Sequence, residues 1–83
     1  MEPIYESSYM GFWIKIFKTH IEYKAARVEA IPINQIASVQ CGMKIFGIEE
    51  KKVVIETSGG KKHSVPVSNP QEVKNKIYEQ IGA

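Results

Sequence analysis

The stretch Ser68 to Ala83 reads SNPQEVKNKIYEQIGA and predicts one short amphipathic helix at the end of a run of strands. Asn69 is a favourable N-cap residue, because its side-chain oxygen can accept a hydrogen bond from a free N–H of the first turn. Pro70 follows at the first helical position, where a missing N–H costs nothing. Glu72 comes three residues after Asn69 and is placed to return a hydrogen bond, as in a capping box.

The apolar side of this helix repeats every four residues. Val73, Ile77 and Ile81 form one stripe with Tyr78 beside it, and the charged side chains fall elsewhere. Gly82 marks the C-terminal end. A helix of this length is only marginally stable alone, so it needs a sheet to lie on.

The residues before the helix predict that sheet, because apolar and polar positions alternate between turn signals. The expected strands cover residues 11–17, 21–25, 30–33, 36–43, 51–57 and 61–67. Residues 44–50 form an apolar connection, and residues 1–10 form an N-terminal arm ahead of one domain at 11–83. The expected fold class is α+β, a small, strongly bent antiparallel sheet or partly open barrel of about six or seven strands, closed by one C-terminal helix.

Composition places the chain among ordinary globular proteins. It has 83 residues, enough for one domain, with 43% hydrophobic residues, 24% charged residues and a net charge of +2. That charge is too small to indicate a nucleic-acid-binding protein, so we do not expect a nucleic-acid partner. All nine acidic residues are Glu, which weakens any carboxylate-ligated metal site.

The single cysteine and the lack of a long apolar run bear on the cellular location. Cys41 is the single cysteine, so no intrachain disulfide can form, and this fits a reducing compartment. No apolar run approaches the length of a membrane span, and residues 1–10 lack the basic start and apolar core of a signal peptide. We therefore expect a cytoplasmic protein or domain, with a place at the membrane periphery as the alternative.

Several motifs carry a resemblance to a known family. They are the hairpin IKIFKTHIEYK, the segment IPINQIASVQ, the glycine in KIFGIEE, the paired strands VVIETSGGKKHSVPV and the helix NPQEVKNKIYEQI. Ile31, Pro32, Ile36 and Val39 match an I-P-x-x-x-I-x-x-V pattern, and Ile55, Thr57, Gly59 and Gly60 match an I-x-T-x-G-G hairpin. In this order, over roughly residues 11–82, the chain resembles the bacterial pleckstrin-homology-like domains.

The resemblance implies a strongly bent sheet closed at one end by the C-terminal helix. Proteins of this fold bind phosphoinositides, peptides or other proteins, and several bacterial members are similar to self-assembling modules. The lipid-binding members end the first hairpin in a basic-x-Arg signature. That signature is absent here, because two alanines separate Lys24 from Arg27.

Two groups of apolar residues are candidates for an interaction surface. Trp13 and Phe17 fall on the outer face of the first expected strand, where aromatic residues can anchor an interface. The alternative is that the arm or the helix covers them. Ile45 and Phe46 lie in the apolar connection, which either docks on a partner or membrane or folds under and caps one barrel end.

The basic residues of the first hairpin form a candidate contact for an anionic headgroup. These are Lys15, Lys18, Lys24 and Arg27. Glu22 and Glu29 lie among them and would oppose an anion, so a solvated charged face is the alternative. Lysine pairs at 51–52 and 61–62 flank a later hairpin, and edge-strand lysines discourage unwanted strand pairing without any ligand.

No catalytic or metal-binding constellation is visible in the sequence. Cys41 lies on an apolar strand face and is interpreted as an inert buried thiol. His63 alternates in phase with Val65 and Val67 and is interpreted as a partly buried structural histidine. Two histidines and one thiol on separate strands are too few for a metal site. The sequence therefore favours a non-enzymatic interaction module without a cofactor, which binds a protein partner or itself. The alternative is a peripheral membrane module that binds anionic lipid.

Overall fold

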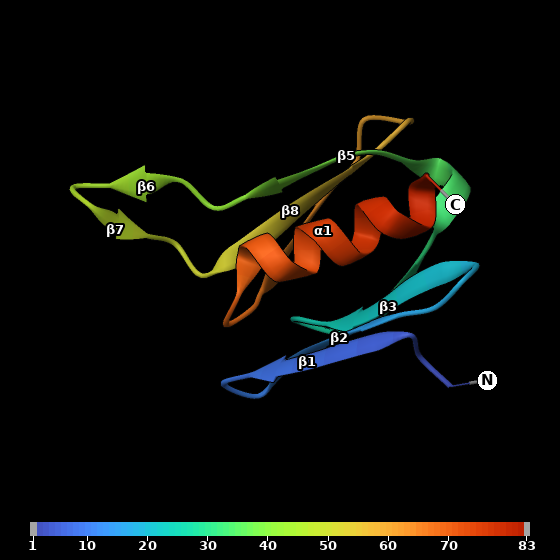
Figure 1. Cartoon of the computed structure of the whole chain (residues 1–83), viewed down its shortest axis with the longest axis horizontal. Helices are drawn as coiled ribbons and strands as arrows, with labels where there is room; N and C mark the ends of the chain where they lie inside the picture. Colours follow the sequence, from blue (N-terminus) through green and yellow to red (C-terminus); the bar gives the residue numbers. More distant parts are fainter. Residues whose placement is uncertain (1, 83) are drawn as a thin grey trace.

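The computed structural model describes residues 2–82 and places antiparallel sheets beside one C-terminal helix (Figure 1). The first sheet has the order β1-β2-β3-β4, with β1 Tyr5–Tyr9, β2 Phe12–Ile16, β3 His20–Lys24 and β4 Val28–Pro32. The second has the order β5-β8-β9, with β5 Ile36–Cys41, β8 Lys52–Thr57 and β9 Lys62–Pro66. A short 3-10 helix η1, Ile33–Gln35, connects the sheets. A two-stranded hairpin, β6 Lys44–Ile45 and β7 Ile48–Glu49, joins β5 to β8, and α1 spans Pro70–Ile81.

The α+β class and the closing helix are confirmed, but strand pairing forms no closed barrel within residues 2–82. The sheets instead approach each other at β2 and β9, and α1 packs on β5 and β8. Figure 1 shows the first sheet below the helix and the second above it. The fold is therefore two antiparallel layers that share one core with the helix.

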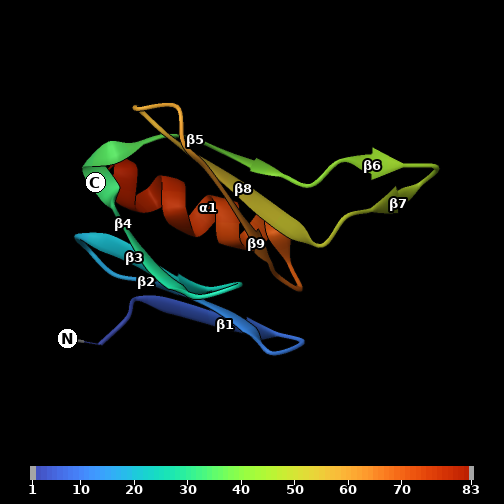
Figure 2. The same cartoon turned by 180° about the vertical axis from the view of Figure 1, so that it is seen from behind.

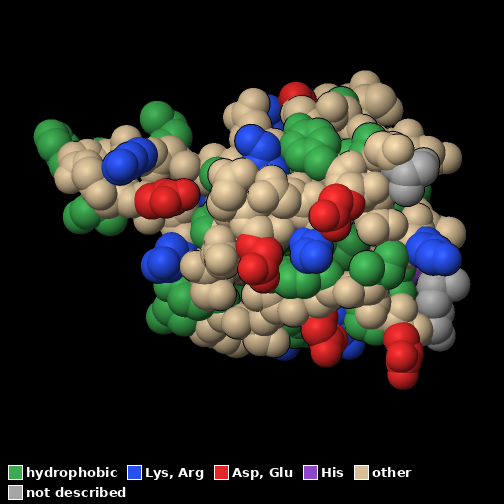
Figure 3. All heavy atoms as spheres, viewed as in Figure 1, with side chains coloured by type: hydrophobic (Ala, Val, Ile, Leu, Met, Phe, Trp, Pro, Cys, Tyr) green, Lys and Arg blue, Asp and Glu red, His purple; other side chains and the backbone are tan. Residues whose placement is uncertain are grey.

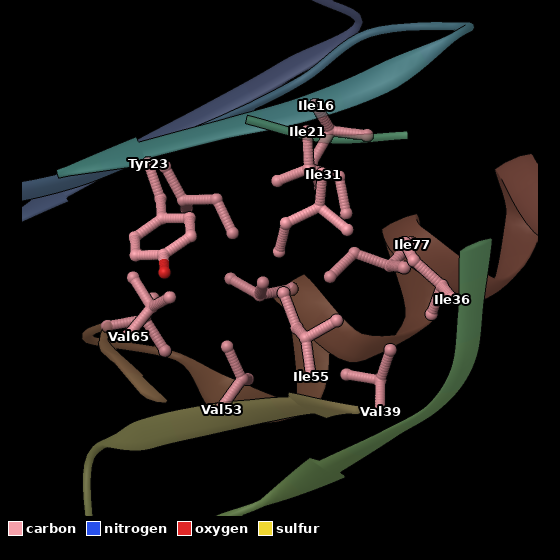
Figure 4. Packing of buried hydrophobic residues seen from close by; sticks show 13 residues of the cluster. Ile16, Ile21, Tyr23, Ile31, Ile36, Val39, Val53, Ile55, Val65 and Ile77 are labelled. Carbon is pink, nitrogen blue, oxygen red and sulfur yellow. The ribbon is translucent and has the colours of Figure 1, made fainter. Parts of the chain in front are cut away.

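The core is built from the inward side chains of every layer (Figure 4). The first sheet contributes Ile14, Ile16, Ile21, Tyr23 and Ile31; the second contributes Val39, Val53, Ile55 and Val65; α1 contributes Val73 and Ile77. Strand alternation predicts these positions, because successive side chains point to opposite faces. Fully burying each Val or Ile stabilises the fold by roughly 1.5–3 kcal/mol before the entropy of ordering is subtracted.

The helix begins as its sequence predicts. The Glu72 N–H donates to Asn69 Oδ1 at 3.2 Å, and Pro70 occupies the first turn. The Glu72 carboxylate does not close a capping box in the described residues, and its Oε1 instead accepts a hydrogen bond from the Tyr5 hydroxyl at 2.6 Å. This contact ties the first strand of the chain to the start of the last helix. Ile81, expected in the apolar stripe, is 36% exposed at the other end of the helix.

The expected N-terminal arm contains a strand. Residues 5–9 pair with β2 across a two-residue turn, Met10–Gly11, in which both φ angles are positive. Such turns match the twist of the flanking strands, so a tight hairpin forms. Only Tyr5, Ser7 and Tyr9 turn partly inward, so this edge strand lacks the apolar alternation that identifies the others.

The free edge of β5 is covered by the helix. The Val39 N–H donates to the Tyr78 hydroxyl at 3.0 Å, and that hydroxyl donates to the Val39 carbonyl oxygen at 3.3 Å. A register shift between Ile36 and Ser38 also bends this strand. Because of the shift, Ile36 and Val39 both face the core although they are three residues apart, and Ala37 is exposed.

No helix within residues 2–82 has the length and apolar character needed to cross a membrane.

Candidate functional site

The hairpin formed by β6 and β7 stands away from the body of the molecule (Figure 2). Ile45 pairs with Ile48, which leaves Phe46 and Gly47 as the two residues of the turn. Their φ angles are 52° and 78°, the positive pair typical of a type I′ hairpin. We call residues 43–49 the finger.

Phe46 is an unusual residue for its place in this turn. Positive φ favours Asn, Asp or Gly, and a bulky side chain there is strained by about 1–3 kcal/mol. Phe46 is nevertheless 99% exposed, so no contact within residues 2–82 compensates for the strain. Strained residues of this kind gather at functional sites, which makes the tip of the finger a candidate.

The whole finger is rich in exposed apolar side chains. The exposed fractions are 69% for Met43, 49% for Ile45, 99% for Phe46 and 74% for Ile48. Figure 3 shows green side chains on this projection, with basic and acidic groups beside them. A contiguous exposed apolar patch on a small protein marks a surface for another molecule.

The finger is anchored where it leaves the second sheet. The Gly42 N–H donates to the Lys52 carbonyl oxygen at 2.8 Å, and the Glu50 N–H donates to the Met43 carbonyl oxygen at 3.0 Å. A Cβ atom on Gly42 would lie 2.6 Å from the Glu50 Cβ, so only glycine fits this close approach. The base of the finger is therefore continuous with the β5–β8 ladder.

These exposures decide between the two interpretations of the apolar connection. The expectation that Ile45 and Phe46 fold under and cap a barrel end is wrong, since both side chains point into solvent. The finger extends beyond the rest of the sheet, so the core offers these side chains no surface within residues 2–82.

Trp13 and Phe17, the other aromatic candidates, do not form one exposed patch. Trp13 is half-buried on the outer face of β2, and Lys15 Nζ lies 5.0 Å from its ring centre. Phe17 is only 7% exposed and stacks on His20 with ring centres 4.6 Å apart. The expected outward position of Phe17 is wrong, because β2 ends at Ile16 and the chain turns at Phe17.

The structure does not bring the four candidate basic residues together. Lys18 precedes β3 and Arg27 follows it, so the length of the strand separates them. Lys24 ends β3, and Lys15 lies between Glu6 and Glu22 in the strand register. Arg27 Nη2 is 3.7 Å from a Glu29 carboxylate oxygen. The arrangement is a mixed charged face and offers no single pocket for an anion.

A part-buried polar cluster, which the sequence does not reveal, connects the two sheets. The Tyr23 hydroxyl donates to Glu29 Oε2 at 2.7 Å and lies 2.5 Å from His63 Nδ1. Because the hydroxyl donates to Glu29, His63 Nδ1–H is the donor to it. Nothing in local sequence places residue 23 beside residue 63, so only the meeting of β3 and β9 could reveal the cluster.

The environment shifts the pKa of each member of this cluster. Burial lowers the pKa of His63, and burial with the Glu29 hydrogen bond raises the pKa of Tyr23. The hydrogen bond from Tyr23 lowers the pKa of Glu29. These shifts favour a neutral imidazole beside an ionised carboxylate, which is partly exposed and also lies 3.7 Å from Lys61 Nζ. His63, expected to be partly buried, is buried more deeply than that, with 7% of its surface exposed.

The remaining reactive groups are scattered. Cys41 is half-buried, with Sγ 3.7 Å from Gln71 Oε1. Across residues 2–82, no three His, Cys, Asp or Glu side chains are grouped closely enough to hold a metal ion. Comparison with protein-family models and with curated proteins finds no match to the chain.

Proposed function

We propose that this chain is a non-enzymatic interaction module with a pleckstrin-homology-like fold, which binds protein through the finger. The first partner to consider is a second copy of the chain. The topology supports the fold assignment: a four-stranded antiparallel sheet is followed by a three-stranded one and then by a single helix.

The observation that carries the proposal is Phe46. An aromatic side chain is held fully in solvent, at a backbone angle that a smaller polar residue would adopt with less strain. The fold gains nothing from this choice within residues 2–82. Burial of the ring against another molecule would supply the missing stabilisation, and aromatic residues are common anchors of protein interfaces.

The Phe46→Asn variant tests this function. Asn tolerates positive φ, so the turn is retained while the apolar tip is lost. Met10→Asn is the matched control, because Met10 occupies the same position of the β1–β2 turn and is also exposed. We expect size-exclusion chromatography with light scattering, over a dilution series, to show self-association in the wild type and in Met10→Asn only. Equal association of all three proteins, or a wild type that is monomeric at every concentration, would remove self-assembly through the finger.

A membrane surface is the second candidate, and the position of the turns favours it. The β1–β2 turn with Met10 and the tip of the finger lie at the same end of the molecule (Figures 1 and 2). Lys44, Lys51 and Arg27 are exposed. We expect flotation with vesicles that contain phosphatidylserine to recover the protein at low salt and to lose it at high salt, since exposed charge is screened. Absence of bound protein at low salt would dismiss this candidate.

A further inference from the structure

A pocket opens at the end of the molecule that is opposite the finger. It lies between the β2–β3 turn, η1 and the last turn of α1, and its volume is about 490 Å³. Pro32, Ile33, Ile36 and Ile81 line it with apolar surface, and Lys18 and Asn34 add polar groups. Ile81 is 36% exposed here, so the pocket presents apolar surface to solvent.

The finger cannot reach the pocket of its own chain. The molecule measures 38 Å along its longest axis. Figures 1 and 2 place β6 and β7 at one end of that axis and η1 with the C-terminal end of α1 at the other. A finger that fills such a pocket must therefore come from a second copy.

Charge also favours this pairing. Lys18 at the pocket and Glu49 on the finger form no ion pair in the part of the chain that the structure describes. Glu49 pairs with Lys44 in the hairpin register, on the face opposite Ile45 and Ile48. An inserted finger thus presents its apolar tip to the pocket, and Glu49, which lies beside Lys44 on the other face of the hairpin, is its carboxylate for the lysine at the pocket edge.

We propose that the finger of one copy inserts Phe46 into the pocket of the next copy, so that the chains associate head to tail. This inference rests on the proposed function and specifies its geometry. Each copy offers one finger and one pocket, which is a heterologous contact. Such contacts build rings when the rotation closes and open filaments when it does not.

Mixing two defective variants tests this geometry. Phe46→Asn removes the finger tip and keeps the pocket. Ile81→Lys removes an apolar wall of the pocket and keeps the finger, and Lys suits the C-terminal turn of a helix. We expect each variant alone to be monomeric by light scattering and an equimolar mixture to form a one-to-one dimer that grows no further.

The other outcomes separate this inference from the proposed function. If Ile81→Lys assembles like the wild type, the pocket is not the partner surface, although the finger still carries association. If both variants are monomeric and their mixture stays monomeric, the head-to-tail geometry is overturned. Circular dichroism and urea denaturation of each variant check that the fold is intact.

A charge exchange gives a second test with exposed residues only. Lys18→Glu and Glu49→Lys should each weaken association by roughly two- to five-fold, the range for an exposed ion pair. The double variant should recover the wild-type value, because the pair is restored with reversed sign. Failure of the double variant to recover association would place Lys18 and Glu49 apart in the assembly and overturn the proposed orientation.

Discussion

Single residues decide where this small domain is strained. Phe46 occupies a positive-φ position at the tip of the finger, and Met10 occupies the equivalent position in the first hairpin. Both are followed by glycine, so an X–Gly pair between short strands is the sequence signal for these turns. The signal identifies the turn but does not say that the first residue will be exposed.

Replacing Phe46 should therefore make the isolated fold more stable. We expect Phe46→Asn to raise the free energy of unfolding by about 1 kcal/mol, since strain at positive φ is relieved. Met10→Asn should give a similar gain. Urea denaturation at a concentration where the protein is monomeric measures both. A loss of stability in Phe46→Asn would mean that the ring makes a stabilising contact in the monomer.

The buried imidazole of His63 predicts a pH dependence. Burial lowers the pKa of His63 in the folded state, so between that value and about 6.5 the unfolded chain binds the proton more readily. The free energy of unfolding should fall as pH drops below about 6.5. The pKa of Glu29 is lowered in the folded state, where its carboxylate accepts a hydrogen bond from Tyr23. The free energy of unfolding should therefore fall further below about pH 4.3, where the carboxylate of the unfolded chain takes up a proton more readily.

Thermal unfolding from pH 8 to pH 4 measures this effect. We expect the midpoint of the wild type to fall through the His63 range and that of His63→Gln to fall only in the carboxylate range. His20→Gln removes the other histidine and leaves the Tyr23–His63–Glu29 cluster in place, so it serves as the matched control. A flat wild-type midpoint between pH 7 and pH 5 would contradict the role of His63.

At the scale of elements, α1 does more than cover the core. Its Tyr78 hydroxyl bonds both backbone groups of Val39, so the open edge of β5 cannot pair with another strand at that point. The apolar stripe predicted the buried face of the helix through Val73 and Ile77. It could not predict the edge contact, which depends on how the helix crosses the sheet.

Tyr78→Phe isolates that edge contact. The ring remains while two backbone groups lose their partner, and we expect the free energy of unfolding to fall by about 0.5–1.5 kcal/mol. Tyr9→Phe is the control, because the Tyr9 hydroxyl makes no side-chain hydrogen bond in the described residues. Chemical denaturation measures the free energy of unfolding of both variants. Equal losses would show that the hydrogen bonds of the Tyr78 hydroxyl to Val39 add no stability.

At the scale of the whole molecule, the finger at one end and the pocket at the other determine how copies of the chain add to an assembly. Head-to-tail contacts leave a free finger and a free pocket on every open assembly. We expect the weight-average mass to rise steadily with concentration rather than to level off at a dimer. Light scattering over a hundred-fold concentration range measures this. A plateau would indicate that the assembly closes on itself, at two copies as a symmetric pair and at a larger number as a ring.

Local sequence determined β2 to β5, β8, β9 and the helix with its cap, because side-chain alternation and backbone preference act between near neighbours. It did not identify β1, β6 or β7 as strands. The buried positions of Ile14, Ile55 and Val65 follow from the same alternation. Tertiary structure alone decided which edges pair, that Phe17 turns inward, and that Tyr23 meets His63. It also decided that the finger extends past the core and lies opposite the pocket. These features depend on contacts between residues far apart in the chain, whose geometry is fixed only when both sheets and the helix pack together.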